Sequence, residues 1–179
     1  MPVKFDGFSK NESIYMMEAF KVLQRGSTAA KQSLLSGNLE GFNRWFDATG
    51  STAHLMKVST IVNEVDQAIN RRPITFAKLD RPGVGVNTKD LCGMVHLVKS
   101  GEDYYHVGSG MRVLVVWATH AQSDLNYLAE TMYHELTHKV GNTDDVGYDR
   151  SFCEQLAERE PHNAVRNAEN YNLFFSEYL

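Results

Sequence analysis

A run of five residues, His134-Glu135-Leu136-Thr137-His138, constrains the fold of this chain more than any other feature of its sequence. Two histidines four positions apart lie on the same face of an α-helix, one turn from each other. Their ring nitrogens can then reach one Zn²⁺ ion at the required distance of about 2.0–2.1 Å without distorting the backbone. Glu135 projects beside such an ion, where a carboxylate can take a proton from a metal-bound water. The run therefore predicts a helix that carries a zinc site.

The residues around this run predict how the helix is placed. Apolar side chains recur along it at spacings of three and four, at Leu125, Leu128, Met132 and Leu136. This stripe lies largely behind the histidine face, so we expect a half-buried helix that points the histidines away from the stripe. Ser123 is the expected N-cap and Gly141 the expected C-terminal stop. The competing interpretation is a pair of solvated histidines that bind no metal.

A catalytic zinc usually takes a third protein ligand, and the residues after the run offer three candidates. Asp144 completes the metzincin pattern HExxHxxGxxD, but that class also needs a methionine turn, and no methionine follows Met132. Glu158 lies twenty residues after His138, as the third ligand does in thermolysin-like enzymes, but without the motif that surrounds the ligand there. Asp145 is the remaining candidate. An Asx turn is the structural alternative for the two aspartates.

The segment 142–148, Asn-Thr-Asp-Asp-Val-Gly-Tyr, resembles the signature G-T-x-D-x-x-Y-G of the aspzincins, the family of deuterolysin and peptidyl-lysine metalloendopeptidase. Thr143, Asp145 and Tyr148 match this signature, whereas Asn142 and Asp149 stand where the family usually has glycine. The resemblance implies that Asp145 is the third zinc ligand. It also implies that the phenol of Tyr148 supports the oxyanion that forms during peptide hydrolysis.

A second segment extends this resemblance toward the C-terminus. Residues 164–170, Ala-Val-Arg-Asn-Ala-Glu-Asn, followed by Phe174, look like the family's A-V-x-N-A-D-N segment. In lysine-specific members, acidic side chains of this segment receive the lysine that follows the cleaved bond. Glu169 matches the first acid, and Asn172 stands where the second acid would be. The resemblance therefore implies a substrate pocket at Glu169 and Asn172 that favours Lys or Arg without requiring either.

Length and charge limit the remaining classes of function. The 179 residues fit one zincin-like metallopeptidase domain over 1–179, large enough to bury its own core. The formal net charge of −4 and the pI of about 6.0 do not favour nucleic acid or an anionic membrane as a partner. No apolar run approaches the ~20 residues of a membrane span. We expect a monomer that acts on a protein or peptide substrate.

The first residues and the cysteines bear on where the protein works. Residues 1–7 contain no apolar stretch of the kind found in a signal peptide. We therefore expect a protein that is secreted, or delivered as an effector, by a route without a visible signal peptide; a cytoplasmic protein is the alternative. Cys92 and Cys153 could pair or stay reduced, and the sequence leaves both possibilities open.

The rest of the chain predicts an α+β fold. Ser9 and Glu12 form a capping box for a first helix, and Ser51 opens a second helix that ends at 71–73. Short extended runs follow at 74–76, 94–98 and 113–117. In a zincin-like fold, the last of these strands precedes the metal-binding helix, and one strand lines the cleft. We therefore expect a single domain with N-terminal helices, a small mixed sheet and an HExxH active-site helix.

Together, these patterns and the family resemblance predict a zinc-dependent endopeptidase of the aspzincin type with one Zn²⁺ ion. The expected ligands are His134, His138 and Asp145. Glu135 is expected to act as general base and then as general acid, and Tyr148 to donate a hydrogen bond to the developing oxyanion. The alternative is a non-catalytic binding domain stabilised by zinc, which a closed fourth coordination position would favour.

Overall fold

Helices and strands share the chain, which confirms the predicted α+β class. The computed structural model describes residues 3–79, 93–94, 98–100, 103–105, 111–121 and 123–179. Its helices are α1 (Lys10–Leu35), α2 (Glu40–Trp45), α3 (Thr52–Arg71), α4 (Trp117–His120), α5 (Leu125–Gly141), α6 (Arg150–Arg159), α7 (Pro161–Ala164) and α8 (Ala168–Ser176). Its strands are β1 (Val3–Asp6), β2 (Ile74–Leu79), β3 (Gly93–Met94), β4 (Val98–Ser100), β5 (Asp103–Tyr105) and β6 (Met111–Val116). Cys92 and the middle of the strand expected over 94–98 lie outside the described residues.

The main sheet is small and mixed, as the sequence predicts. Within the described residues its strand order is β1-β2-β6-β3. β1, β2 and β6 run parallel, and β3 pairs antiparallel with β6 at the edge. Phe76 of β2 is fully buried and packs edge-on against Phe20 of α1, which joins the sheet to the helical layer. β6 ends at Val116, one residue earlier than expected, because Trp117 already begins α4.

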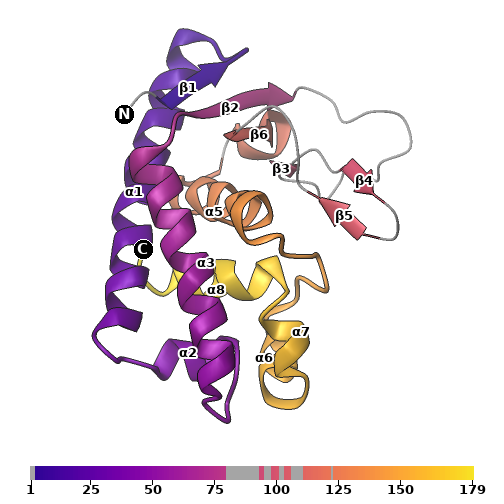
Figure 1. Ribbon diagram of the computed structural model, residues 1–179. Coiled ribbons are helices and arrows are strands. Elements are labelled where there is room, and N and C mark those ends of the chain that lie inside the picture. Colours follow the sequence, from indigo (N-terminus) through magenta and orange to yellow (C-terminus); the bar gives the residue numbers. More distant parts are fainter. Residues whose placement is uncertain (1–2, 80–92, 95–97, 101–102, 106–110, 122) are drawn as a thin grey trace.

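The two N-terminal helices begin where the sequence predicts. Ser9 and Glu12 form the capping box, in which each side chain bonds the backbone N–H of the other residue. α3 follows Ser51 and ends at Arg71, just before Pro73, which cannot continue a helix. Figure 1 shows α1 and α3 side by side along one flank, with the sheet at one end and α8 crossing behind α3. α5 packs against both of these helices.

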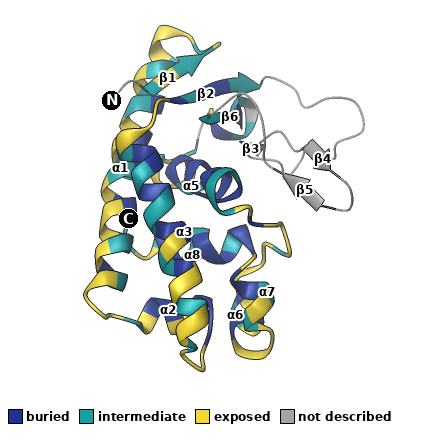
Figure 2. Cartoon of the chain, in the orientation of Figure 1, coloured by how far each residue is buried: buried dark blue, intermediate teal, exposed yellow. Residues whose placement is uncertain are grey.

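Helix α5 lies at the centre of the molecule and is not half-buried as expected. Every residue from Thr131 to His138 is buried, and Figure 2 shows α5 in dark blue along most of its length. The prediction was wrong because the polar face is covered as well: α8, β3 and the connection after α5 all contact it. The expected boundaries also shift. Asp124 is the N-cap in place of Ser123, and Asn142, with φ of 50°, follows Gly141 as the left-handed stop.

The C-terminal helices close the structure around α5. Phe175 of α8 stacks on Tyr133 of α5, with ring centroids 4.2 Å apart. The connection 142–149 between α5 and α6 runs beside the start of α8, where Asp144 and Asn167 form a parallel bridge. Among the described residues, no helix is both long and apolar enough to cross a membrane. α5, this connection and the start of α8 together position the candidate site.

Candidate metal centre

Helix α5 brings its two histidines together through helical geometry alone. His134 and His138 stand one turn apart on the same face, and their Nε2 atoms lie 3.2 Å from each other. Both residues are nearly enclosed, with 8% and 5% of their surface exposed. Imidazole nitrogens this close would repel each other if both were protonated. The arrangement therefore suits a shared cation better than two independent histidines.

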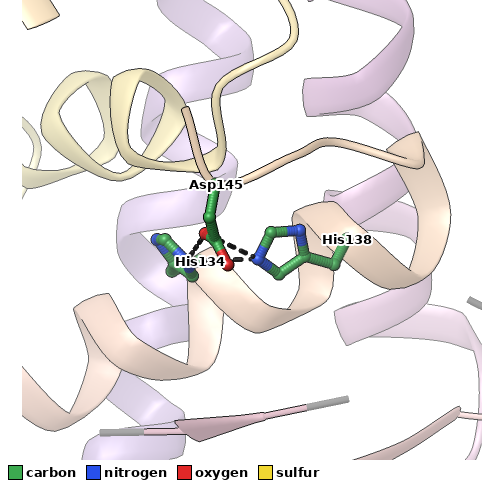
Figure 3. Close-up of side chains that lie close together, drawn as sticks. All are labelled: His134, His138 and Asp145. Atoms are coloured by element: carbon green, nitrogen blue, oxygen red, sulfur yellow. Dashed lines mark hydrogen bonds and ion pairs between the residues drawn. The ribbon is translucent and has the colours of Figure 1, made fainter. Parts of the chain in front are cut away.

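Asp145 is the aspartate that the structure brings to these histidines. Its Oδ1 atom lies 3.1 Å from Nε2 of His134 and 3.2 Å from Nε2 of His138. Figure 3 shows the carboxylate reaching in from the α5–α6 connection and pointing between the two rings. Asp144 instead turns outward and pairs with the guanidinium of Arg166. Glu158, the thermolysin-like candidate, is exposed on α6.

These three donor atoms fit a zinc ion. Tetrahedral coordination at about 2.0–2.1 Å places neighbouring donors about 3.3 Å apart, close to the separations of 3.1 to 3.2 Å found here. In the described part of the chain, His134, His138 and Asp145 are the group whose ligand atoms gather in this way. Two imidazoles and one carboxylate form a common catalytic zinc set, which leaves a fourth position for water.

The second nitrogen of each imidazole has its own partner. Nδ1 of His138 lies 2.7 Å from the carbonyl oxygen of Thr143, and Nδ1 of His134 lies 3.2 Å from Oε2 of Glu169. When Nδ1–H donates to these acceptors, the lone pair of each ring is left on Nε2, where a metal would bind. Glu169 was expected from the family resemblance to receive substrate. The structure gives it a contact with a histidine that the sequence did not indicate.

The expected partner of Glu169 in the substrate pocket, Asn172, lies next to it. Nδ2 of Asn172 is 3.3 Å from Oε1 and 3.4 Å from Oε2 of Glu169. Its Oδ1 atom is buried and has no hydrogen-bond partner among the residues that the structure describes. The two residues expected to receive substrate are therefore brought together at the first two turns of α8. Glu169 also contacts His134.

Burial and charge create a site that favours a cation. Burial alone would lower the pKa of His134, but hydrogen bonds to Asp145 and Glu169 outweigh it and raise that pKa to about 10. Burial works against ionisation of Asp145 too, yet its hydrogen bonds to both histidines hold its pKa well below the usual range. The carboxylates of Asp145 and Glu169 thus favour a positive charge at the two histidines. A proton or a metal ion can supply that charge, and they compete for the same Nε2 atoms.

Glu135 lies between the histidine face and the edge of the sheet. Only 6% of its surface is exposed, and burial raises the pKa of its carboxyl group. The backbone of β3 comes unusually close, because a Cβ atom added at Gly93 would lie 2.7 Å from Cγ and 2.9 Å from Oε1 of Glu135. Gly93 therefore leaves the space that the Glu135 side chain occupies. β3 is therefore the strand that lies against Glu135.

Tyr148 stands at the solvent side of the site. Its ring lies 5.9 Å from the ring of His134, nearly parallel to it, and 62% of the residue is exposed. Partial burial, together with the charge of Asp145 and a hydrogen bond to it, raises the pKa of the Tyr148 phenol. The phenol therefore keeps its proton near neutral pH and remains a hydrogen-bond donor.

Known proteins resemble this chain in sequence and in fold. Residues 29–176 match the sequence profile of the aspzincin family, described as lysine-specific metallo-endopeptidase. An extracellular protease of Aeromonas hydrophila is 27% identical over 140 residues, which cover 76% of this chain and 36% of that protein. The solved zinc peptidase of Grifola frondosa has the same fold, with a TM-score of 0.74 and 18% identity over 95% of this chain and 97% of that one. The chain belongs to the aspzincin family of metallo-endopeptidases.

Proposed function

We propose that this protein is a zinc-dependent endopeptidase in which His134, His138 and Asp145 hold a single Zn²⁺ ion. The observation that carries the proposal is the gathering of these three donor atoms at separations suited to one tetrahedral ion. Because the chain spans about a third of the length of the Aeromonas protease, the activity is inferred from the site and the family together.

The chemistry follows from the groups around the three donors. Zinc, when bound, supplies a Lewis acid that makes a water molecule more acidic. Glu135 would accept a proton from the attacking water and later give it to the leaving amine, a role suited to a buried carboxylate with a raised pKa. Tyr148 donates a hydrogen bond to the substrate oxygen as negative charge develops on it. Glu169 and the Thr143 carbonyl hold the two imidazoles in the orientation that binding requires.

We further propose a modest preference for Lys or Arg after the scissile bond. A basic side chain would be drawn to the carboxylate of Glu169, with Asn172 as its polar neighbour. Glu169 already bonds His134, so part of its charge is committed to the site itself. One shared carboxylate contributes only about 0.2–1 kcal/mol to such a pairing when water can reach it. Discrimination between basic and other residues should therefore be limited.

The alternative of a non-catalytic, zinc-stabilised domain is less well supported. A structural zinc site usually has four protein ligands. Among the described residues, the group at the site supplies three. We propose that the enzyme is a monomer that acts on a protein or peptide substrate. We also propose that it is secreted, as the name of the extracellular Aeromonas protease suggests for that protein.

Metal removal and replacement test the activity directly. The purified protein should cleave denatured casein, lose this activity when a chelator removes its zinc, and regain it with one equivalent of Zn²⁺. A chelated protein that cleaves casein at the original rate would overturn the proposal. Stable folding without cleavage, with zinc still bound, would favour the structural alternative.

A further inference from the structure

Asn167 uses its side chain in an unusual way for its position. It is the N-cap residue of α8, where an asparagine normally accepts a hydrogen bond from an N–H of its own helix. Asp124 and Asp149 do this at the starts of α5 and α6. The side chain of Asn167 makes no such bond and turns toward the α5–α6 connection, although it is fully buried.

The side chain binds the backbone between the two loop-borne site residues. Its Oδ1 atom accepts hydrogen bonds from the N–H groups of Val146, at 2.9 Å, and Gly147, at 3.3 Å. Its Nδ2 atom donates to the carbonyl oxygen of Gly147 at 2.9 Å. Val146 and Gly147 separate Asp145 from Tyr148 in the chain. One buried amide therefore fixes the short stretch of backbone on which both residues depend.

Neighbouring backbone groups complete this attachment. The N–H of Asp144 donates to the carbonyl of Arg166, at 2.7 Å, and the N–H of Ala168 donates to the carbonyl of Asp144, at 2.9 Å. On its other side, Nδ2 of Asn167 bonds Oδ1 of Asn170 at 2.7 Å, which holds the amide in one orientation. The connection is thus tied to the start of α8, the same element that places Glu169 against His134.

We infer that Asn167 is a positioning residue that sets the place of Asp145 and Tyr148 relative to the α5 histidines. The inference rests on the proposed zinc site. If Asn167 served mainly to stabilise α8, its side chain would be expected to cap that helix, and it does not. Its hydrogen bonds go instead to the segment that completes the metal centre.

The test compares Asn167→Ala with a control substitution at another buried side chain that holds a connection between two helices. Asp47, which is 1% exposed, accepts hydrogen bonds from the N–H groups of Thr49 and Ser51 and so ties the α2–α3 connection, which carries no site residue. Both Asn167→Ala and Asp47→Ala should lower the melting temperature. Only Asn167→Ala should weaken zinc binding, by roughly 10–100-fold, and speed amide hydrogen exchange at Val146 and Gly147. With saturating zinc, its kcat should fall roughly tenfold while KM changes little.

Asn167→Asp keeps the test decisive if the alanine variant does not fold. The carboxylate retains both acceptor positions but cannot donate to Gly147 or Asn170, so zinc affinity should fall by less than in Asn167→Ala. Zinc affinity and amide exchange equal to those of the parent in both variants would overturn the inference. A parent protein that binds no zinc would instead refute the proposed function, while exchange at Val146 and Gly147 would still report on the attachment.

Discussion

The two halves of the site are held by different kinds of structure. His134, Glu135 and His138 stand on α5, where repeated backbone hydrogen bonds and packing on all sides fix their spacing. Asp145 and Tyr148 stand on a connection that is tied down by side chains and backbone of residues about twenty positions later. The positions of the helical residues should therefore tolerate substitutions of neighbouring side chains. The positions of Asp145 and Tyr148 should instead depend on a few contacts with residues distant in the sequence.

The largest effect should come from the helical half, through Glu135→Gln. The amide matches the carboxylate in shape but cannot accept a proton, so peptidase activity should fall by about 10²–10⁴-fold. Zinc content and melting temperature should stay near those of the parent because α5 is unchanged. Glu154→Gln, the same substitution on the exposed face of α6, is the matched control. Casein cleavage at the parental rate by the Glu135 variant would show that another group is the base.

The loop half is tested by its two adjacent aspartates. Asp145→Ala should lower zinc affinity by more than about 100-fold, because a ligand is lost rather than a supporting group. Asp144→Ala should leave zinc bound, since that carboxylate pairs with Arg166 at the surface. Equilibrium titration with Zn²⁺ compares the two variants. Loss of zinc in the Asp144 variant alone would assign the third ligand to Asp144 and contradict the loop geometry.

Glu169 links the two halves, and Glu169→Gln separates its two roles. Loss of the carboxylate at Nδ1 of His134 should weaken zinc binding by about 10-fold and slow cleavage of every substrate. The preference for Lys or Arg should also largely disappear. A variant that loses only the preference, with parental zinc affinity, would show that Glu169 serves the substrate and does not position His134.

The connection between α2 and α3, which is held by the side chain of Asp47, should respond to acid. Burial opposes ionisation of Asp47, but hydrogen bonds from Thr49 and His54 prevail and lower its pKa from 3.8 to about 2. A carboxyl group whose pKa is lower in the folded than in the unfolded protein stabilises the fold at pH values above its unfolded pKa. This contribution is lost as the pH falls from about 4 to about 2. Asp47→Asn should therefore remove about 1–2 kcal/mol at neutral pH and little at pH 2. Chemical denaturation at both pH values measures this, and equal losses would contradict the assignment.

The smallest expected effect concerns specificity. Asn172→Asp restores an acid beside Glu169 and should sharpen the preference for Lys or Arg by about 0.2–1 kcal/mol, or up to about fivefold. Cut-site profiling on a denatured protein mixture can measure this change against the parent. A parental profile without enrichment of basic residues after the scissile bond would remove Glu169 and Asn172 from the substrate pocket.

The same contrast explains what could be predicted from the sequence. The positions of His134, Glu135 and His138 follow from helical spacing, and Asp145 was singled out by resemblance to a family signature. The capping box of Ser9 and Glu12 was equally local and was found where predicted. The full burial of α5, the contact of Glu169 with His134 and the bonds of Asn167 to Val146 and Gly147 depend on segments that meet only after folding. No spacing within the chain encodes those contacts.

The coordination of zinc in the purified protein tests the proposed site most directly. Metal analysis combined with a crystal structure of the zinc-loaded protein should give one Zn²⁺ per chain, bound by Nε2 of His134, Nε2 of His138 and a carboxylate oxygen of Asp145, with water in the fourth position. A protein that takes up no zinc, or that fills the fourth position with another side chain, would contradict a catalytic metal centre at this site.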